Sequence, residues 1–120
     1  MSGFKIGRIT SDITAALAEL LREIKDPRVS NLLSIVKVDV SGDLSYATVY
    51  VSAIDGYDST VKSVKGLKSA AGYLRRELGS RLKLRKVPEL RFVADDSIIK
   101  SAEIMNIIES FDKNSGSSEE

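Results

Sequence analysis

The sequence contains no cysteine, no histidine and no tryptophan. Without cysteine the chain forms no disulfide, and without cysteine or histidine it cannot build the usual structural zinc sites. No run of 18 apolar residues occurs, and the N-terminus lacks the unbroken apolar stretch of a signal peptide. We therefore expect a soluble cytoplasmic protein that needs no metal and no other cofactor.

The same absences weaken the case for an enzyme. Without histidine and cysteine, the candidate catalytic groups are carboxylates such as Asp95 and Asp96. Neighbouring residues in an extended segment point to opposite sides, so these two acids cannot act as a pair. They fit better as a strand end followed by a helix cap at Asp96 or Ser97. Neither GxxxxGK[ST] nor GxGxxG occurs, and we predict no catalytic activity.

What the sequence does contain is typical of one small globular domain. It has 120 residues, of which 42% are hydrophobic and 29% charged. The net charge of +1 hides an asymmetry, because residues 62–91 carry ten Lys or Arg against two acids, whereas residues 95–120 carry seven acids against two lysines. A basic segment of this density favours a polyanion as partner, since neutralising phosphates releases counterions.

The N-terminal third predicts a helix over residues 4–24. Seven apolar residues recur there at steps of three and four: Ile6, Ile9, Ile13, Leu17, Leu20, Leu21 and Ile24. The helix must end near Asp26, because Pro27 disfavours a helical conformation in the residue before it. The Asp-Pro-Arg turn has a second interpretation, in which nearby cations extend a basic surface; these are Arg22, Lys25 and Arg28.

Two runs of alternating residues follow and predict an antiparallel hairpin. Val36, Val38 and Val40 share one face, and after Ser-Gly-Asp the alternation resumes over residues 46–53. Tyr46 and Tyr50 fall on the outer face of the second strand. They are either stacking surfaces for bases or covered by one of the chain ends, and cover is the more common case.

The basic segment returns to helical periodicity over residues 59–82, with Ser59 as a candidate N-cap. A third strand is expected over residues 90–95, and residues 97–111 favour a last helix with apolar positions at Ile104, Ile108 and Phe111. We expect helices on one side of a three-stranded sheet, an α+β fold.

Gly72 and Gly79 interrupt this basic helix, although a helix-interior glycine costs about 1 kcal/mol relative to alanine. On a helical wheel both glycines fall between the cations, away from the apolar side. They either let an anion approach the backbone, aided by the free amides of a new helix start, or permit a kink or close packing. The sequence leaves both explanations open.

At these residues the sequence resembles the ribosome-binding factor A family of bacterial assembly factors. The matching stretches are REIKDPRV, VDVSGDLSYATVYVS and AAGYLRRELGSRLKLRKVPELRFVADDS. The resemblance implies a type II KH-like domain of order α-β-β-α-(kink)-α-β, in which a kink replaces the usual GXXG loop. The kink maps to Ser69, Ala70, Ala71 and Gly72. The domain would span residues 1–96, followed by a helical extension over 97–111 and a disordered tail over 112–120.

The resemblance also implies a function without chemistry. Family members bind the free small (30S) ribosomal subunit and its 16S rRNA, assist late maturation of that rRNA, and are associated with growth in the cold. We expect a monomer whose RNA contacts come from the basic segment: Lys65, Lys68, Arg75, Arg76, Arg81, Lys83, Arg85, Lys86 and Arg91. Further contacts are expected from Arg8, Arg22, Lys25 and Arg28.

Two alternatives remain. One is a general KH protein that binds single-stranded RNA, although such proteins use an intact GXXG clamp. The other is a protein-interaction module that docks through Ile104, Ile108 and Phe111. Salt dependence separates these classes, because binding to phosphates weakens steeply with salt and apolar docking does not.

Overall fold

The structure is a computed structural model that describes residues 3–97. Its elements follow the order α1 (Gly3–Glu23), β1 (Leu33–Val40), β2 (Tyr46–Ala53), α2 (Tyr57–Ser69), α3 (Ala71–Leu82) and β3 (Glu89–Ala94). The predicted tail over residues 112–120 and almost all of the predicted last helix over 97–111 lie outside the described residues.

Helix α1 uses the apolar stripe that the sequence predicts. Ile13, Leu17 and Leu20 are completely buried, because their spacing places them on one side of the helix. The helix ends at Glu23, three residues before Asp26. The predicted helix and its end before the Asp-Pro-Arg turn are therefore confirmed.

The three strands form one sheet in the order β1-β2-β3. β1 and β2 pair antiparallel, whereas β3 lies parallel to β2 with Tyr46 opposite Glu89 and Val51 opposite Ala94. The hairpin is confirmed, but the expectation that Val36 shares one face with Val38 and Val40 is wrong. The pairing shifts between Ile35 and Lys37, and this irregularity leaves Val36 37% exposed.

Helical periodicity predicts one helix over residues 59–82, and the family resemblance implies a kink at residues 69–72; the structure has two helices that meet at a bend in that place. α2 ends at Ser69, Ala70 has φ −93° and ψ 1°, and α3 begins at Ala71. Ser59 is not the N-cap of α2, because the helix already begins at Tyr57 after Gly56. The Ser59 hydroxyl instead donates a hydrogen bond to the carboxylate of Asp55.

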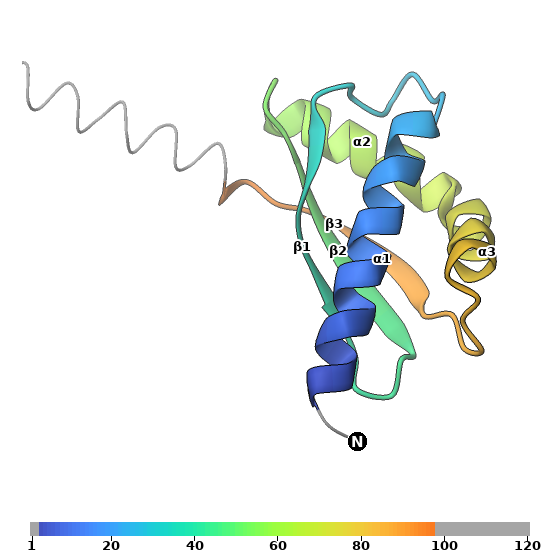
Figure 1. The fold of residues 1–120 in the computed structure, drawn as a ribbon. Coiled ribbons are helices and arrows are strands. Elements are labelled where there is room, and N and C mark those ends of the chain that lie inside the picture. The colour runs from blue at the N-terminus through green and yellow to red at the C-terminus, as the bar shows by residue number, and fades with distance from the viewer. Residues whose placement is uncertain (1–2, 98–120) are drawn as a thin grey trace, which may run out of the picture.

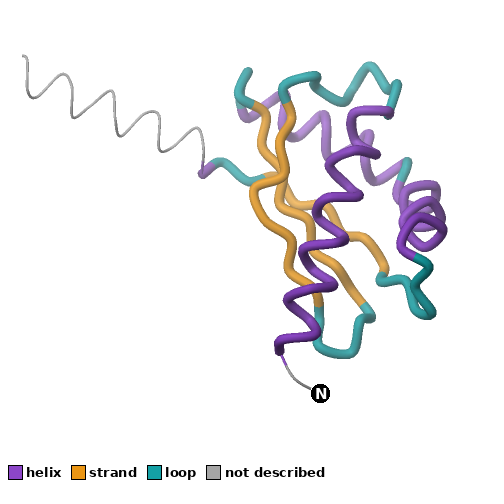
Figure 2. Tube along the Cα trace, in the orientation of Figure 1, coloured by secondary structure: helices purple, strands orange, loops and turns teal. Residues whose placement is uncertain are grey.

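All three helices cover the same face of the sheet (Figures 1 and 2). One core joins them to the sheet through buried side chains such as Leu17 of α1, Leu67 of α2, Leu74 of α3, Val49 of β2 and Phe92 of β3. The predicted α+β arrangement is confirmed. It leaves the opposite face of the sheet free of these helices and fixes the bend between α2 and α3 at the surface.

Candidate nucleic-acid interface

The bend between α2 and α3 creates an open helix start. Backbone amides at the bend close α2 by donating to the carbonyls of Gly66, Leu67 and Lys68, and the amide of Leu74 bonds back to the carbonyl of Ala70. Within the described part of the chain no side chain caps the N-terminus of α3. The first amides of a helix lack partners within it and carry partial positive charge. This start is therefore able to receive an anion.

Gly72 lies in the first turn of α3 and faces open space. A Cβ atom added at Gly72 would meet no other atom within 4 Å, so packing does not require glycine there. Arg76 lies four residues further on and therefore beside Gly72 on the helix surface. The missing side chain leaves the backbone accessible next to a cation, as the anion-access interpretation of this glycine expects.

Several cations around this bend are free of internal partners. Lys62, Lys65 and Lys68 recur every three residues on the exposed side of α2, and Arg76 is exposed on α3. Among residues 3–97, none of these four side chains makes a hydrogen bond or ion pair. Their charges are therefore available to a ligand at no cost in internal contacts.

The other end of α3 is closed. A Cβ atom at Gly79 would lie 2.7 Å from Cγ2 of Val87, so this glycine permits close packing and gives no access to an anion. Arg75 is also engaged here, because its Nε and Nη2 donate to the carbonyl of Val87 at 3.2 and 2.9 Å. For Gly79 the anion-access interpretation is wrong, and the packing interpretation holds.

The segment between α3 and β3 is tied to the hairpin. Lys83 ends α3 in the left-handed conformation with φ 52°, which lets the amide of Leu84 bond to Gly79. Nζ of Lys86 donates to the carbonyl of Asp43 at 3.0 Å. Lys83 and Arg85 are exposed, and their side chains contact no polar partner within residues 3–97.

Two further cations of the predicted set also lie away from the bend. Arg81 points to α1 and pairs with Glu19 at 3.4 Å and Glu23 at 3.2 Å. The hydrogen bonds that Arg81 donates to the carboxylate of Glu23 raise the pKa of Arg81 above its ordinary value. Arg91 lies on the opposite face of the sheet, where its guanidinium carbon is 3.7 Å from the centre of the Tyr46 ring. The nine predicted cations thus do not form one continuous surface.

The four additional predicted cations are also dispersed. Arg8 and Arg22 lie 14 residues apart on α1, about 21 Å along its axis. Lys25 is exposed just beyond the helix. RNA contact by any predicted residue stays a prediction.

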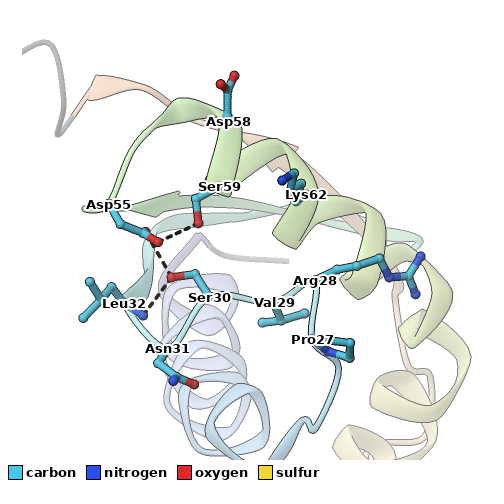
Figure 3. Close-up of a pocket in the computed structure, with 10 residues that line it drawn as sticks. All are labelled: Pro27, Arg28, Val29, Ser30, Asn31, Leu32, Asp55, Asp58, Ser59 and Lys62. Atoms are coloured by element: carbon cyan, nitrogen blue, oxygen red, sulfur yellow. Dashed lines mark hydrogen bonds between the residues drawn. The ribbon is translucent and has the colours of Figure 1, made fainter.

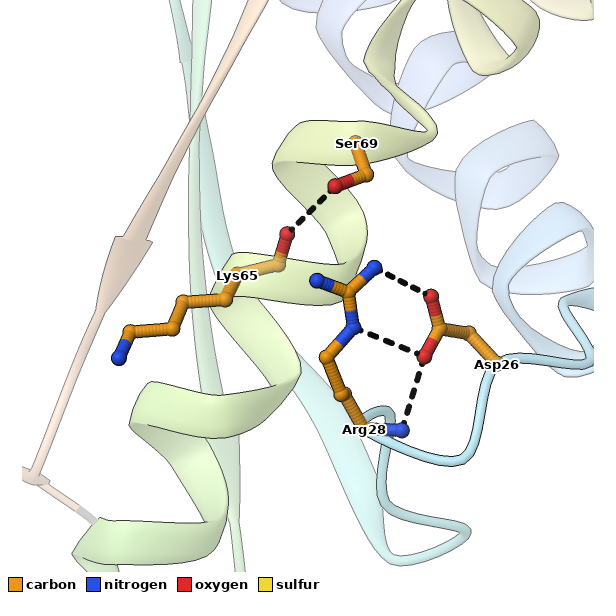
Figure 4. Close-up of polar contacts among 4 residues, drawn as sticks. All are labelled: Asp26, Arg28, Lys65 and Ser69. Atoms are coloured by element: carbon orange, nitrogen blue, oxygen red, sulfur yellow. Dashed lines mark hydrogen bonds and ion pairs between the residues drawn. The ribbon is translucent and has the colours of Figure 1, made fainter.

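Arg28 is neutralised by its neighbour (Figure 4). Both ends of its guanidinium bond to the carboxylate of Asp26, at 3.1 and 2.8 Å, and its amide donates to the same carboxylate. These hydrogen bonds lower the pKa of Asp26 to about 2. The Asp-Pro-Arg turn is thus a self-contained structural unit, which favours its interpretation as the end of the helix.

A hollow of about 620 Å³ lies between this turn and the start of α2 (Figure 3). The hydroxyls of Ser30 and Ser59 both donate to Asp55 at its edge. Its lining mixes acids, including Asp58, with Lys62 and Arg28. Because the two signs of charge balance, the hollow offers no preference for an anion, and we assign it no ligand.

Sequence reasoning placed Asp95 and Asp96 at a strand end, with a cap at Asp96 or Ser97. In the structure it is Asp95 that accepts hydrogen bonds from the amide and hydroxyl of Ser97. The predicted site omits Lys62, which lies on the same exposed side of α2 as Lys65 and Lys68. Its three-residue spacing to Lys65 is the signal in the sequence that identifies it.

The element order, the parallel β3 and the two helices meeting at a bend define a KH-like α+β domain. A sequence model of the ribosome-binding factor A family matches residues 5–108. Ribosome-binding factor A of Acetivibrio thermocellus is 44% identical over 115 residues, covering 94% of each chain. The chain belongs to the ribosome-binding factor A family.

Solved structures agree with this family. The crystal structure of ribosome-binding factor A from Thermus thermophilus superposes with a TM-score of 0.65 at 30% identity, covering 73% of this chain and 92% of that one. A homology model of the Thermus thermophilus factor, fitted into a cryo-EM map of a 30S complex, gives a TM-score of 0.63 at 29% identity and covers 74% and 93%. The KH-like fold implied by the resemblance is confirmed. No helix within residues 3–97 has the length and hydrophobicity that a membrane span requires.

Proposed function

We propose that this protein is a ribosome assembly factor that binds the free small subunit through its 16S rRNA and assists late maturation of that RNA. The observation that carries the proposal is the bend at Ala70. There an uncapped helix start, an open Gly72 and the free cations Lys68 and Arg76 occur together. Membership of the family, and the 30S complex of its Thermus thermophilus relative, support the ribosomal partner.

The phosphate backbone of rRNA fits this surface chemically. Phosphate oxygens accept hydrogen bonds from backbone amides at helix starts and from Lys or Arg side chains. Such contacts fix position and orientation without reading base sequence. The bend would therefore recognise a particular path of the RNA backbone.

The mechanism is a shift in population and involves no bond breaking. A protein that binds one folded form of an RNA more tightly than its competitors favours that form, in proportion to the difference in affinity. Lower temperature slows escape from misfolded forms, so such a factor would matter most in the cold. The proposed protein acts as a cytoplasmic monomer and needs no cofactor.

The test is sedimentation of the full chain with purified ribosomal particles in sucrose gradients at low salt. We expect co-sedimentation with free small subunits and none with complete ribosomes. Binding that is equal for both particles, or absent from both, would overturn the proposal. Equal binding to small subunits and to unrelated structured RNA would point to a general RNA-binding protein.

A further inference from the structure

The outer face of the sheet, opposite the three helices, carries two cation–aromatic pairs. On β2, Tyr46, Thr48 and Tyr50 lie on this face, because they alternate with the buried residues Ala47, Val49 and Val51. The guanidinium carbon of Arg91, from β3, lies 3.7 Å from the ring centre of Tyr46, and Nζ of Lys37, from β1, lies 4.8 Å from that of Tyr50. One pair is therefore built with each edge strand.

Strand pairing fixes both pairs on a rigid surface. Lys37 stands directly opposite Tyr50, whereas Arg91 stands opposite Thr48 and reaches diagonally to Tyr46. Tyr46 is 41% exposed and the side chain of Arg91 is 53% exposed, so this pair remains open to a ligand. Val93, opposite Tyr50, is 38% exposed and extends the flat surface beside the second pair.

We propose that this face is a second RNA-binding surface, on which two unpaired nucleobases stack, one on the Tyr46–Arg91 pair and one on the Tyr50–Lys37 pair. Every base has a flat π-face, and aromatic rings and guanidinium planes are the surfaces on which proteins stack splayed bases. The inference rests on the proposed function for the identity of the partner as RNA.

The spacing of the pairs defines the form of the RNA. Tyr46 and Tyr50 are four residues apart on one strand, about 13 Å. Bases stacked in a duplex follow one another every 3.4 Å or so and cannot occupy both positions as neighbours. The ligand must therefore be an extended single strand with at least one nucleotide between the two stacked bases.

The charge of this face differs from that at the bend. Lys37 and Arg91 are balanced by Asp39 on β1 and Glu89 on β3, so the outer face has no net charge. Arg91 is also held by Glu89 at 3.4 Å. Binding here must come from stacking and hydrogen bonds to base edges, and it should persist at salt concentrations that weaken phosphate contacts.

The experiment measures binding of a labelled 12-nucleotide single strand, and of a hairpin of the same composition, to the full chain at moderately high salt. The variant Tyr46→Leu/Tyr50→Leu keeps the size and apolar character of both side chains but removes their aromatic faces. We expect it to bind the single strand about tenfold more weakly or worse. Tyr46→Phe/Tyr50→Phe should bind within about twofold of the wild type, because stacking does not need the hydroxyl.

Tyr57→Leu is the matched control, since Tyr57 is 47% exposed but lies at the start of α2. It should bind like the wild type. The proposal is overturned if Tyr46→Leu/Tyr50→Leu binds the single strand as well as the wild type does. It is also overturned if Tyr57→Leu weakens binding as much as Tyr46→Leu/Tyr50→Leu does. The first result would fit a face covered by another segment of the chain or by a protein partner.

A second measurement separates this inference from the proposed function. Tyr46→Leu/Tyr50→Leu and the wild type are compared for sedimentation with small subunits at low salt, where phosphate contacts dominate. If only the assignment of the outer face is wrong, the wild type and Tyr46→Leu/Tyr50→Leu bind small subunits equally, and they also bind the single strand equally. If the proposed function is wrong, the wild type itself fails to sediment with small subunits, whatever its affinity for the oligonucleotide.

Discussion

The two ends of α3 carry similar residues but have different environments. Near the bend, Gly72 faces open space and Arg76 has no internal partner within residues 3–97. Near the loop to β3, Gly79 packs on Val87, and the side chain of Arg75, the residue before Arg76, reaches the carbonyl of Val87. The two glycines, at opposite ends of α3, and the two adjacent arginines thus have different environments.

This difference shows why counting charges overstates an interface. Ten cations lie within residues 62–91, but Arg75, Arg81, Lys86 and Arg91 spend part of their hydrogen-bonding capacity inside the molecule. A ligand at those positions must compete with existing contacts. The free cations at the bend meet no such competition. A phosphate can therefore bind them without breaking an internal hydrogen bond or ion pair.

The glycine pair gives the largest expected contrast. Gly79→Leu should lower the free energy of unfolding by about 3 kcal/mol, because the new side chain collides with Val87. Gly72→Leu should leave it unchanged or raise it by up to about 1 kcal/mol, since its side chain enters open space and leucine favours a helix more than glycine does. Urea unfolding of the two variants measures both values.

The same pair separates folding from binding. Gly72→Leu should remain folded and lose affinity for small subunits, because the bulky side chain blocks the backbone at the bend. Equal stability of the two variants would contradict the packing difference. Undiminished subunit binding by Gly72→Leu would contradict the role of backbone access.

The neighbouring arginines give a smaller contrast. Arg75→Met removes two hydrogen bonds to the carbonyl of Val87 and should cost about 1 kcal/mol of unfolding free energy. Arg76→Met removes no hydrogen bond or ion pair with residues 3–97 and should cost less than about 0.5 kcal/mol, yet it should weaken subunit binding more strongly. Thermal or urea unfolding, paired with sedimentation, tests the two. The comparison fails if Arg76→Met is the less stable variant.

The smallest effect concerns Arg28, the cation that its own turn neutralises. The pKa of Asp26 falls from 3.8 to about 2 through hydrogen bonds from Arg28. A lowered folded-state pKa stabilises the fold above the unfolded value, and this contribution disappears as pH falls towards the folded value. The stability difference between wild type and Asp26→Asn should therefore be constant above about pH 5 and shrink between about pH 4 and pH 2.

Arg28→Met is the matched control for that pH dependence, because it removes the partner that lowers the pKa. Its stability difference from the wild type should shrink over the same interval. A difference that stays constant down to pH 2 in either variant would show that the ion pair contributes nothing.

The spacing of apolar residues predicted most of the fold, because burial of one face of a helix or strand fixes that spacing directly. The stripe of α1 and the alternation of β2 were readable, since a residue facing the core must be apolar at every turn or every second position. Val36 was misplaced because the irregularity at Ile35 to Lys37 shifts the pairing without changing the apolar pattern. The start of α2 was missed because Gly56, which has φ 130°, precedes the helix and Ser59 pairs with Asp55 instead.

The candidate site was less predictable, because it depends on contacts between distant residues. Nothing near Gly79 in the sequence distinguishes it from Gly72; the difference comes from Val87, eight residues away across a loop. Likewise, Arg81 meets Glu19 and Glu23 only because α1 packs against α3. The division of the cations into free and engaged groups required the three-dimensional structure.

The most direct test of the account is the salt dependence of small-subunit binding by Lys68→Gln/Arg76→Gln and by Arg81→Gln. For each lost phosphate contact, the slope of log affinity against log salt should fall by about 0.7 to 0.9. We expect a reduction of about 1.4 to 1.8 for the pair at the bend and almost none for Arg81→Gln, whose cation is already held by Glu19 and Glu23. An unchanged slope for the pair, or an equal reduction per charge in both variants, would contradict the assignment of the bend as the phosphate-binding site.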